Sequence, residues 1–235
     1  MSCSKWSVHG NVYLLVERVD GARLTAGEAA RLAAEEGTDG VLEVLEVDGP
    51  EAEIAIWNPD GSRAEMSGNG TRIAARWLAE RAQTSEVRIR VGERVVGARL
   101  SNGEVEQELG EVLLGDPIEV EGLRVVPVSV GNPHAVVVGD PADVGWIGPL
   151  LETHPQFPER TNVQVVRVDS PGRVSARVWE RGVGETASSG TSAVAVAAAT
   201  HGEGTVVVSF PGGALSVRLE QGRAYLSGPA ERLDG

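Results

Sequence analysis

Two serines in this sequence stand directly before glycine-containing turns that open helix-like segments. Ser67 begins the stretch SGNGTR, and Ser189 begins SGTSAV. Glycines in such a turn let the backbone approach a ligand closely, and a helix N-terminus presents free N–H groups and the positive end of a dipole to an anion. The simplest interpretation of each serine is a helix N-cap. Beyond that, the pattern predicts two turns that could hold a carboxylate, each with a hydroxyl beside it.

The segments around the two serines belong to an internal repeat. Trp57 stands ten residues before Ser67 and Trp179 ten before Ser189, so AIWNPDGSRAEMSGNG aligns with RVWERGVGETASSGTS. Three further pairs follow in the same order: Gly10-Asn11 before VYLLVE with Gly131-Asn132 before HAVVVG, GVLEVLEVD with NVQVVRVD, and ARLSNGEVEQEL with VRLEQGRAYLSG. Four matches in one order indicate two homologous halves of about 115 residues that meet near GEVLLGDPIE.

Two such halves facing each other would bring both serines and both helix N-termini to one cleft. The paired N-termini would supply N–H donors and partial positive charge to a carboxylate. Groups on opposite faces of a bound carbon suit stereoinversion, in which a base removes a proton from one face and an acid returns one to the other. The alternative is that the duplication only built a stable two-domain fold.

Short β-branched segments bounded by Gly, Asp, Asn or Pro predict many strands, and they outnumber the helical segments. Helices are predicted at residues 25–37, 70–82 and 190–202, with a Pro- and Gly-interrupted candidate at 140–154. Thr25 is the predicted cap of the first helix and Gly37 its end. Strands and helices do not alternate one for one, which favours an α+β fold, with sheets wrapped around a few helices, over a doubly wound parallel sheet.

Charge and cysteine content limit the class of protein. The chain of 235 residues has a formal net charge of −13, which disfavours nucleic acid or an anionic membrane as partner and favours a soluble protein. Cys3 is the only cysteine, so no disulfide framework is expected. No apolar run approaches the length of a membrane span, and MSCSKWSVHG lacks the apolar core of a signal peptide. A cytoplasmic location is therefore expected.

No cofactor is predicted. Four dispersed histidines and one terminal cysteine provide no metal-ligand cluster. SGNG lacks the strand–GxGxxG–helix context of a dinucleotide site, and Lys5, the only lysine, is too isolated to argue for a Schiff base with pyridoxal phosphate.

Five motifs span nearly the whole chain in order: KWSVHGNVYLLVE, NPDGSRAEMSGNGTR, VGNPHAVVV, TNVQVV and WERGVGETASSGTSA. Together they resemble the diaminopimelate epimerase family of cofactor-independent amino-acid racemases. The resemblance implies two pseudo-symmetric halves, each a curved β-sheet around a central helix, with the active site between them. It places the first half at residues 1–115 and the second at 116–224, and it returns residues 225–235 to the first half.

The resemblance also implies roles for individual residues. Ser67 and Ser189 stand where the family carries its two catalytic cysteines, which act as thiolate base and thiol acid on opposite faces of the α-carbon. His134 and Glu180 stand where the family places polar partners of those thiols. The implied substrate-binding residues are Asn11, Asn58, Gly68, Asn69, Asn132, Asn162, Glu180, Arg181, Gly190 and Thr191. Simpler explanations exist for some: Asn132-Pro133 is a common turn, Arg181 could be a solvated ion-pair partner, and His134 a satisfied buried histidine.

Four positions depart from the family pattern. Val12 replaces an acidic residue, Ser192 replaces a glycine, and Ser67 and Ser189 replace cysteines. A thiol has a pKa of about 8.5, whereas an alkanol lies closer to the value of about 15.7 for water. A serine therefore acts as a base only if another group takes its proton. Here His134 would serve Ser67, and Glu180 would serve Ser189.

Three hypotheses about function stay open. The first is an isomerase that interconverts LL- and meso-diaminopimelate in lysine and cell-wall precursor synthesis with a serine-based acid–base pair. The second is a Cys-to-Ser form that binds the substrate but turns it over poorly or not at all. The third is a family relative that binds or isomerises another small carboxylate. Each implies a small-molecule partner, and because family members often dimerise, a homodimer is expected.

Overall fold

A computed structural model describes residues 1–17, 21–101 and 103–233, which divide into two compact units. Unit 1 comprises Met1–Gln107 and Gly228–Gly235, and unit 2 comprises Glu108–Ser227. Asn102, in the fourth repeat match, and residues 234–235 of the predicted C-terminal return lie outside the described residues.

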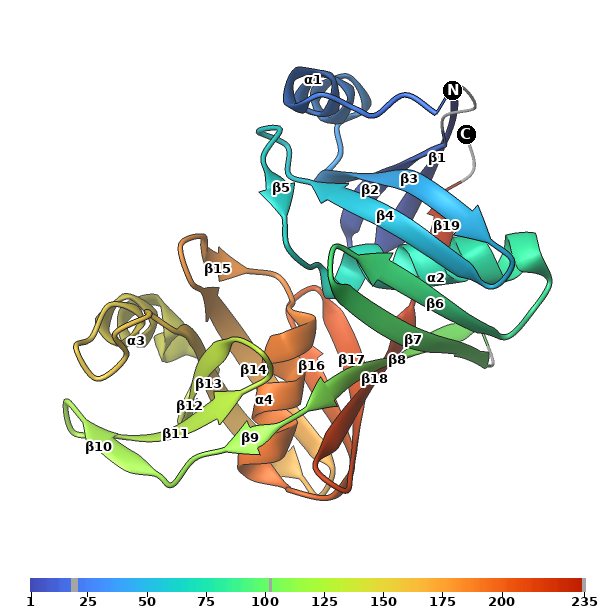
Figure 1. The fold of residues 1–235 in the computed structure, drawn as a ribbon. Helices are drawn as coiled ribbons and strands as arrows, with labels where there is room; N and C mark the ends of the chain where they lie inside the picture. The colour runs from blue at the N-terminus through green and yellow to red at the C-terminus, as the bar shows by residue number, and fades with distance from the viewer. Residues whose placement is uncertain (18–20, 102, 234–235) are drawn as a thin grey trace. The chain divides into compact units, whose positions relative to one another are not determined.

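Unit 1 contains a β-sheet and two helices (Figure 1). Its helices are α1 (Ala26–Glu36) and α2 (Gly68–Ala82). Its strands are β1 (Ser2–Val8), β2 (Asn11–Glu17), β3 (Gly40–Asp48), β4 (Glu51–Trp57), β5 (Arg63–Ala64), β6 (Glu86–Val91), β7 (Arg94–Ser101), the first part of β8 (Glu104–Glu111), and β19 (Glu231–Leu233). β1 pairs antiparallel with both β2 and β19, so the last described strand joins this unit.

Unit 2 holds the remaining helices and strands. Its helical segments are η1 (Pro141–Asp143), α3 (Val144–Glu152) and α4 (Gly190–Thr200). Its strands are β9 (Leu113–Leu114), β10 (Ile118–Val120), β11 (Leu123–Ser129), β12 (Pro133–Val138), β13 (Asn162–Ser170), β14 (Arg173–Glu180), β15 (Gly184–Thr186), β16 (Gly204–Phe210), β17 (Gly213–Glu220) and most of β18 (Arg223–Pro229).

The two units repeat one order of strand pairing. In unit 1, β2 is parallel to β3, β3 antiparallel to β4, β4 antiparallel to β5 and parallel to β6, and β6, β7 and β8 follow as an antiparallel meander. Unit 2 shows the same relations from β12 through β18. Even a register shift recurs, between Val44 and Glu46 in one unit and between Val168 and Ser170 in the other. The internal repeat and the α+β class predicted from the sequence are confirmed.

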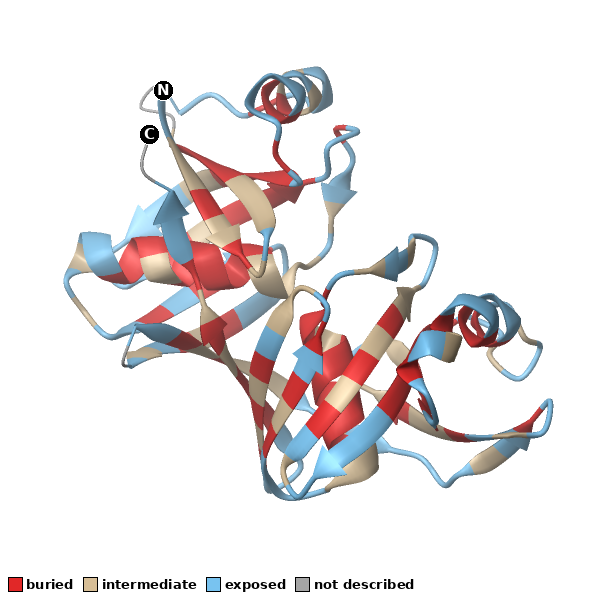
Figure 2. Ribbon diagram, turned by 180° about the vertical axis from the view of Figure 1, so that it is seen from behind, coloured by how far each residue is buried: buried red, intermediate tan, exposed pale blue. Residues whose placement is uncertain are grey.

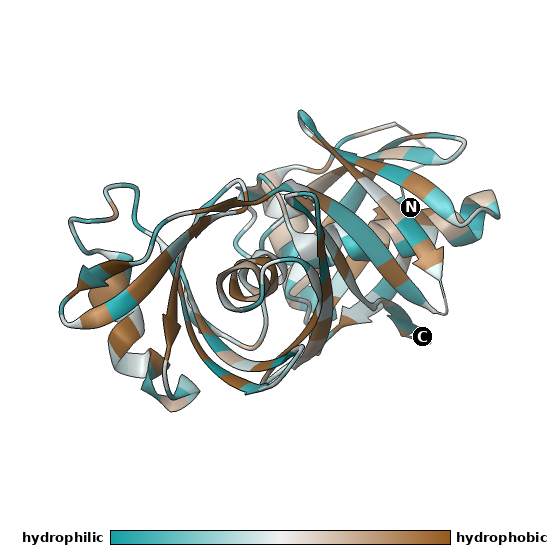
Figure 3. Cartoon of the chain, turned by 90° about the horizontal axis from the view of Figure 1, so that it is seen from below, coloured by the Kyte–Doolittle hydropathy of each residue, from teal (hydrophilic) through white to brown (hydrophobic). Residues whose placement is uncertain are grey.

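A central helix is buried in each unit. Ile73, Ala74, Ala75, Leu78 and other α2 residues are buried, as is the run 192–198 of α4 (Figure 2). In unit 2 the strands curve around α4, which Figure 3 shows end-on. A helix that is apolar on nearly all sides is stable only inside a core, and the small side chains of α4 allow the surrounding strands to approach it. Each central helix therefore has a fixed position within its own unit.

The helix predictions hold, with shifted ends. Thr25 caps α1 in a capping box with Glu28, and Gly37 ends that helix with a left-handed backbone at φ 62°. α2 begins at Gly68, two residues before the predicted start, with Ser67 as its N-cap. α4 ends at Thr200, before the predicted Gly202. Periodicity alone leaves the ends of a helix uncertain by one or two residues, and capping bonds and core contacts decide them.

Candidate functional site

The hydroxyl of Ser67 serves as the cap of α2. The Ser67 backbone is extended, at φ −144° and ψ 119°. Its Oγ accepts a hydrogen bond from the Gly70 N–H at 3.0 Å and lies 3.3 Å from the hydroxyl of Tyr13 on β2. The N-cap interpretation is confirmed for this serine, and a second polar group lies within reach of its oxygen.

The first turn of α2 is held tightly from two sides. A Cβ at Gly70 would lie 2.9 Å from Cδ2 of Leu42, so a side chain at this position would collide with the sheet. On another side, the side-chain amide of Gln107 donates to the Gly68 carbonyl at 3.0 Å and accepts from the backbone N–H of Arg72 at 3.0 Å. In this orientation both polar atoms of the amide have hydrogen-bonding partners. These contacts fix the turn that carries Ser67, Gly68 and Asn69.

Two other predicted site residues of unit 1 are Asn58 and Asn11. Asn58 follows β4 and donates from Nδ2 to Ser62 Oγ at 2.9 Å, within the loop that leads to Ser67. Asn11 opens β2 and lies two residues from Tyr13, hence on the same face of that strand.

Ser189 uses its hydroxyl differently from Ser67. It also occupies an N-cap position, with φ −148° and ψ 130°, but within the described chain its side chain makes no capping hydrogen bond to α4. Instead the hydroxyl lies close enough to the Glu180 carboxylate to lower the pKa of that group, and the carboxylate accepts a bond of 2.6 Å from Thr186 Oγ1. Burial raises the pKa of Glu180 above the usual carboxyl value, while the bonds from Thr186 and Ser189 partly oppose that rise. Unit 2 thus contains a hydroxyl paired with a proton acceptor.

His134 lies in a buried chain of polar side chains. Its Nε2 is 2.9 Å from Asn132 Oδ1, and its Nδ1 is 3.0 Å from the amide nitrogen of Gln164. An amide nitrogen can only donate, so in this assignment Nδ1 accepts and Nε2 carries the ring hydrogen. Burial lowers the pKa of His134 to about 3, a bond from Gln164 opposes this, and the charge of Arg181 lowers it further. The imidazole is therefore neutral at physiological pH, with both nitrogens engaged.

The same chain explains the departure at Ser192. Gln164 also donates to Ser192 Oγ, at 3.0 Å. In the internal repeat Ser192 corresponds to Gly70, and Gln164 corresponds to Leu42, the residue that excludes a side chain at Gly70. A glutamine in place of the leucine gives the serine hydroxyl a hydrogen-bonding partner, so the first turn of α4 tolerates a side chain where that of α2 does not.

Glu152 of α3 organises the turn that carries Arg181. It accepts hydrogen bonds from Gly182 N at 2.6 Å and from Trp179 Nε1 at 2.8 Å, and it forms an ion pair with Arg160. Asn162 adds a bond of 3.0 Å from the Arg181 N–H to its Oδ1. The turn after Glu180 is therefore fixed from two directions.

Replacing Glu152 by Gln is expected to lower the free energy of unfolding at pH 7 by about 2 kcal/mol, the scale of hydrogen bonds to a buried charged group. Burial favours the neutral acid, but the bonds from Trp179 and Gly182 and the charge of Arg160 bring the pKa of Glu152 below its ordinary value. A lowered folded-state pKa adds stability above the unfolded pKa, and this is lost as pH falls through the folded value. Urea unfolding at pH 7 and below pH 4 should show the difference between the two proteins shrinking in acid.

The control is Glu35→Gln, which removes an exposed carboxylate paired with Arg31 on α1. It should cost at most about 0.5 kcal/mol at either pH. A Glu152→Gln variant as stable as the wild type at pH 7 would contradict the organising role of this carboxylate.

The predicted site residues are grouped within each unit. Unit 1 places Ser67, Gly68 and Asn69 in one helical turn, and unit 2 joins Glu180 to Ser189, His134 to Asn132, and Asn162 to Arg181. Gly190 and Thr191 form the first turn of α4, and a Cβ at Gly190 would lie 2.9 Å from Leu226 Cδ2.

Four polar residues beside these groups were not predicted from the sequence: Tyr13, Gln107, Gln164 and Thr186. A signal existed for two of them. Tyr13 occupies the repeat position equivalent to His134, because Gly10-Asn11 and Gly131-Asn132 precede them at the same spacing. Thr186 lies within the GET motif, between Glu180 and Ser189. Side chains from distant strands, such as Gln107, carry no such local signal.

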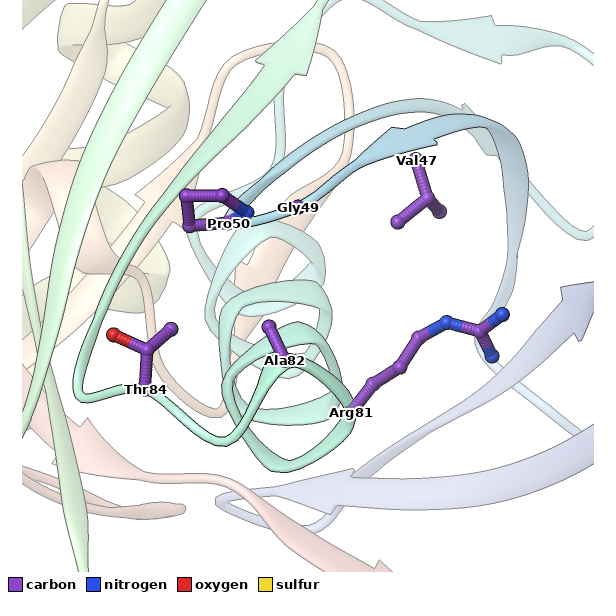
Figure 4. A pocket seen from close by; sticks show the side chains of 6 residues that line it. All are labelled: Val47, Gly49, Pro50, Arg81, Ala82 and Thr84. Atoms are coloured by element: carbon purple, nitrogen blue, oxygen red, sulfur yellow. The ribbon is translucent and has the colours of Figure 1, made fainter.

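A surface hollow of about 400 Å³ lies at the opposite end of α2 (Figure 4). It is lined by Val47, Gly49, Pro50, Arg81, Ala82 and Thr84. α2 has 15 residues, so roughly 22 Å of helix separates this hollow from Ser67. Arg81 is already paired with Glu17 at 2.9 Å. The hollow contains none of the predicted site residues.

Neither a metal centre nor a membrane span is found in the described ranges. No group of three or more His, Cys, Asp and Glu side chains there could hold a metal ion. None of the described helices combines the length and apolar character that a bilayer crossing requires.

Comparison with known proteins relates this chain to one family. The family model described as "Diaminopimelate epimerase" matches residues 3–116 and again residues 126–233, once in each half. The chain belongs to the diaminopimelate epimerase family. A relative named diaminopimelate epimerase from Pelotomaculum thermopropionicum is 38% identical over 230 aligned residues, which cover 84% of this chain and 82% of the relative. The chloroplastic diaminopimelate epimerase of Oryza sativa subsp. japonica is 35% identical, covering 97% and 77%.

Solved structures share the diaminopimelate epimerase-like fold at low identity. A phenazine biosynthesis protein of the PhzF family from Enterococcus faecalis has a TM-score of 0.74 at 11% identity, covering 100% of this chain and 98% of its own. A hydroxyproline epimerase from Agrobacterium vitis has a TM-score of 0.64 at 15% identity, covering 98% and 88%. At these identities the likeness is one of fold.

Proposed function

We propose that this chain is a diaminopimelate epimerase-type isomerase, which interconverts LL- and meso-diaminopimelate by removing and returning a proton on opposite faces of the α-carbon. The observation that carries the proposal is the Ser189–Glu180 pair at the N-terminus of α4. It provides the proton acceptor that a serine needs in order to act as a base. The names of the related proteins support the choice of substrate.

On the side of unit 2, proton removal proceeds through Ser189. Its Oγ takes the α-proton while its own hydroxyl proton passes to Glu180, so Ser189 ends neutral and Glu180 ends as the acid, which releases its proton to solvent before the next turnover. The raised pKa of Glu180 makes its carboxylate a stronger acceptor than an ordinary one. The N–H groups of Gly190 and Thr191 at the helix N-terminus hold the α-carboxylate and stabilise the charge that develops on it.

On the side of unit 1, Ser67 returns a proton. Its oxygen accepts the Gly70 N–H, which stabilises the negative charge left when the hydroxyl proton leaves. The Tyr13 hydroxyl, 3.3 Å away, replaces that proton and is itself reprotonated from solvent. A phenol donates a proton more readily than it accepts one. In this proposal the unit 1 side therefore acts as the proton donor and the unit 2 side as the proton acceptor.

His134 acts in this proposal as a positioning residue for Asn132. A neutral imidazole with both nitrogens hydrogen-bonded and a pKa of about 3 is a poor proton acceptor. The remaining substrate-binding residues are proposed as Asn11, Asn58, Gly68, Asn69, Asn132, Asn162 and Arg181. Of these, Asn11, Asn58, Asn162 and Arg181 are suited to the far carboxylate and amine of the substrate. We further propose a cytoplasmic homodimer that acts in lysine and cell-wall precursor synthesis.

The function is tested by hydrogen exchange. Purified protein is incubated with LL-diaminopimelate in deuterated water, and proton NMR together with chiral chromatography follows loss of the α-hydrogen and formation of the meso isomer. Both are expected, at a rate well above that of Ser189→Ala, which removes the proton-transferring hydroxyl. Folded wild-type protein that exchanges no faster than a protein-free control would rule the proposal out.

A further inference from the structure

Arg72, on the second turn of α2, is a buried cation without a full set of partners. Its exposure is 0%. Among the described residues its Nε and Nη1 have no hydrogen-bond partner, and the one polar contact of Nη2 is Asn69 Oδ1 at 3.5 Å. Buried charges are normally paired, so an incomplete set of acceptors around a guanidinium needs an explanation.

The group remains charged. Burial lowers the pKa of Arg72 to about 10, and the negative charge of Glu104 partly opposes this. The neighbouring His9 offers no acceptor with a negative charge: its Nε2 is also buried without a partner, and burial and the charge of Arg72 lower its pKa. A full positive charge is therefore stored beside the first turn of α2.

Packing does not explain this charge. The repeat position equivalent to Arg72 in α4 is Val194, which is fully buried in the apolar core of unit 2. An apolar side chain is therefore compatible with this position of a central helix. One turn further along α2, Arg76 shows the ordinary arrangement, an ion pair of 2.6 Å with Glu80.

Arg72 also determines the direction of the Asn69 side chain. Because Oδ1 of Asn69 faces the guanidinium, its NH₂ group points away from Arg72 and remains available as a donor. Helical side chains tilt toward the N-terminus, which brings the guanidinium under the turn formed by Ser67, Gly68 and Asn69. Free N–H groups, an oriented amide donor and a fixed cation are thus assembled at one place.

We propose that Arg72 is the built-in counter-charge of an anion site at the N-terminus of α2. It acts as a positioning residue: it orients Asn69 and supplies positive potential, and a bound carboxylate or small oxyanion completes its charge balance. The identity of the natural anion as the substrate α-carboxylate rests on the proposed function, whereas the anion site itself does not.

The test compares Arg72→Met with Arg76→Met, which removes a paired guanidinium from the same helix. Sodium sulfate is titrated against each protein by calorimetry and by thermal unfolding, with sodium chloride at equal ionic strength as reference; LL-diaminopimelate is titrated in parallel. Arg72→Met is expected to melt at or above the wild-type temperature without anion, to bind sulfate at least tenfold more weakly, and to raise the KM for LL-diaminopimelate more than it lowers kcat. Arg76→Met should bind sulfate as the wild type does.

Two results would overturn the proposal. One is unchanged sulfate affinity in Arg72→Met. The other is an Arg72→Met protein that melts well below the wild type in the absence of anion, which would mark a structural role. If Arg72→Met does not fold, Arg72→Lys is compared with Arg72→Gln. The lysine keeps the positive charge but not the planar guanidinium, and the glutamine removes the charge. Equal sulfate affinities of these two variants would contradict a counter-charge. The sulfate titration gives this answer even if the protein fails to epimerise diaminopimelate.

Discussion

Replacing Ser67 and Ser189 together by cysteine is expected to raise the rate of α-proton exchange of LL-diaminopimelate by about 10³-fold or more, which is a barrier reduction of ~4 kcal/mol. The difference of about seven pKa units between an alkanol and a thiol corresponds to ~10 kcal/mol before any effect of environment. In the proposed mechanism, proton transfer from Ser189 to Glu180 recovers only part of that for the serine form. The Gly70 N–H and the α2 dipole, already directed at Oγ of Ser67, would stabilise a thiolate in the same place.

The single variants should differ. Ser67→Cys places a thiol beside a neutral phenol and a backbone donor, whereas Ser189→Cys places one beside the Glu180 carboxylate, where like charge disfavours the thiolate. Thiolate absorbance as a function of pH should therefore report the lower pKa for the cysteine at position 67. Ser85→Cys, at an exposed site, is the control for adding a thiol and should leave the exchange rate unchanged. A folded double variant that is no faster than the wild type would show that these positions do not carry the proton transfer.

The fold could be predicted largely because the chain repeats itself. The repeat fixed the equivalence of β3 with β13 and of α2 with α4, and the strand pairing follows that equivalence in both units. The side chains that hydrogen-bond to the repeated residues could not be predicted in this way. Trp57 and Trp179 occupy equivalent positions and each donates its indole N–H to a buried glutamate, yet Glu43 comes from β3 and Glu152 from α3. Because the two glutamates come from elements that are not equivalent in the repeat, their shared role as indole acceptors leaves no common pattern in the sequence.

The sequence proposes residue types and positions for the candidate site, but it does not predict their hydrogen bonds. Ser67 and Ser189 are both N-caps in sequence and in backbone conformation, and only tertiary contacts separate them. In unit 1 the residue equivalent to Glu180 is Asn58, which bonds to Ser62 and leaves Ser67 to cap its helix. In unit 2 the Ser189 hydroxyl does not cap α4 and lies near the Glu180 carboxylate, as expected if a charged acceptor attracts a hydroxyl more strongly than a backbone N–H does. Whether each serine caps its helix or faces a carboxylate therefore depends on the residue nine positions before it. The sequence alone does not say which of the two arrangements forms.

Glu180→Gln is expected to reduce α-proton exchange of the wild-type serine form by at least about 10³-fold, because an amide cannot take the proton that Ser189 must release. Gln is nearly isosteric and can still accept the Thr186 hydroxyl at its Oε1, so the geometry around Ser189 is retained. Deuterium incorporation into LL-diaminopimelate measures the effect. Glu185→Gln is the matched control: it removes a carboxylate paired with Arg177 in the same β14–β15 segment and should keep the exchange rate within about threefold, as expected for a solvent-accessible pair.

The same substitution should separate catalysis from stability. Burial raises the pKa of Glu180, so the folded state disfavours its ionised form, and the stability associated with this group is present at low pH and is lost as pH rises through the folded-state value. Glu180→Gln removes that cost and should unfold at or above the wild-type temperature at pH 7, although it is inactive. The exchange rate of the wild type should rise with pH through the raised pKa of Glu180, and the variant should lack this rise. A Glu180→Gln protein that keeps both its activity and its pH profile would mean that Ser189 passes its proton elsewhere, and one that unfolds well below the wild type would make the carboxylate structural.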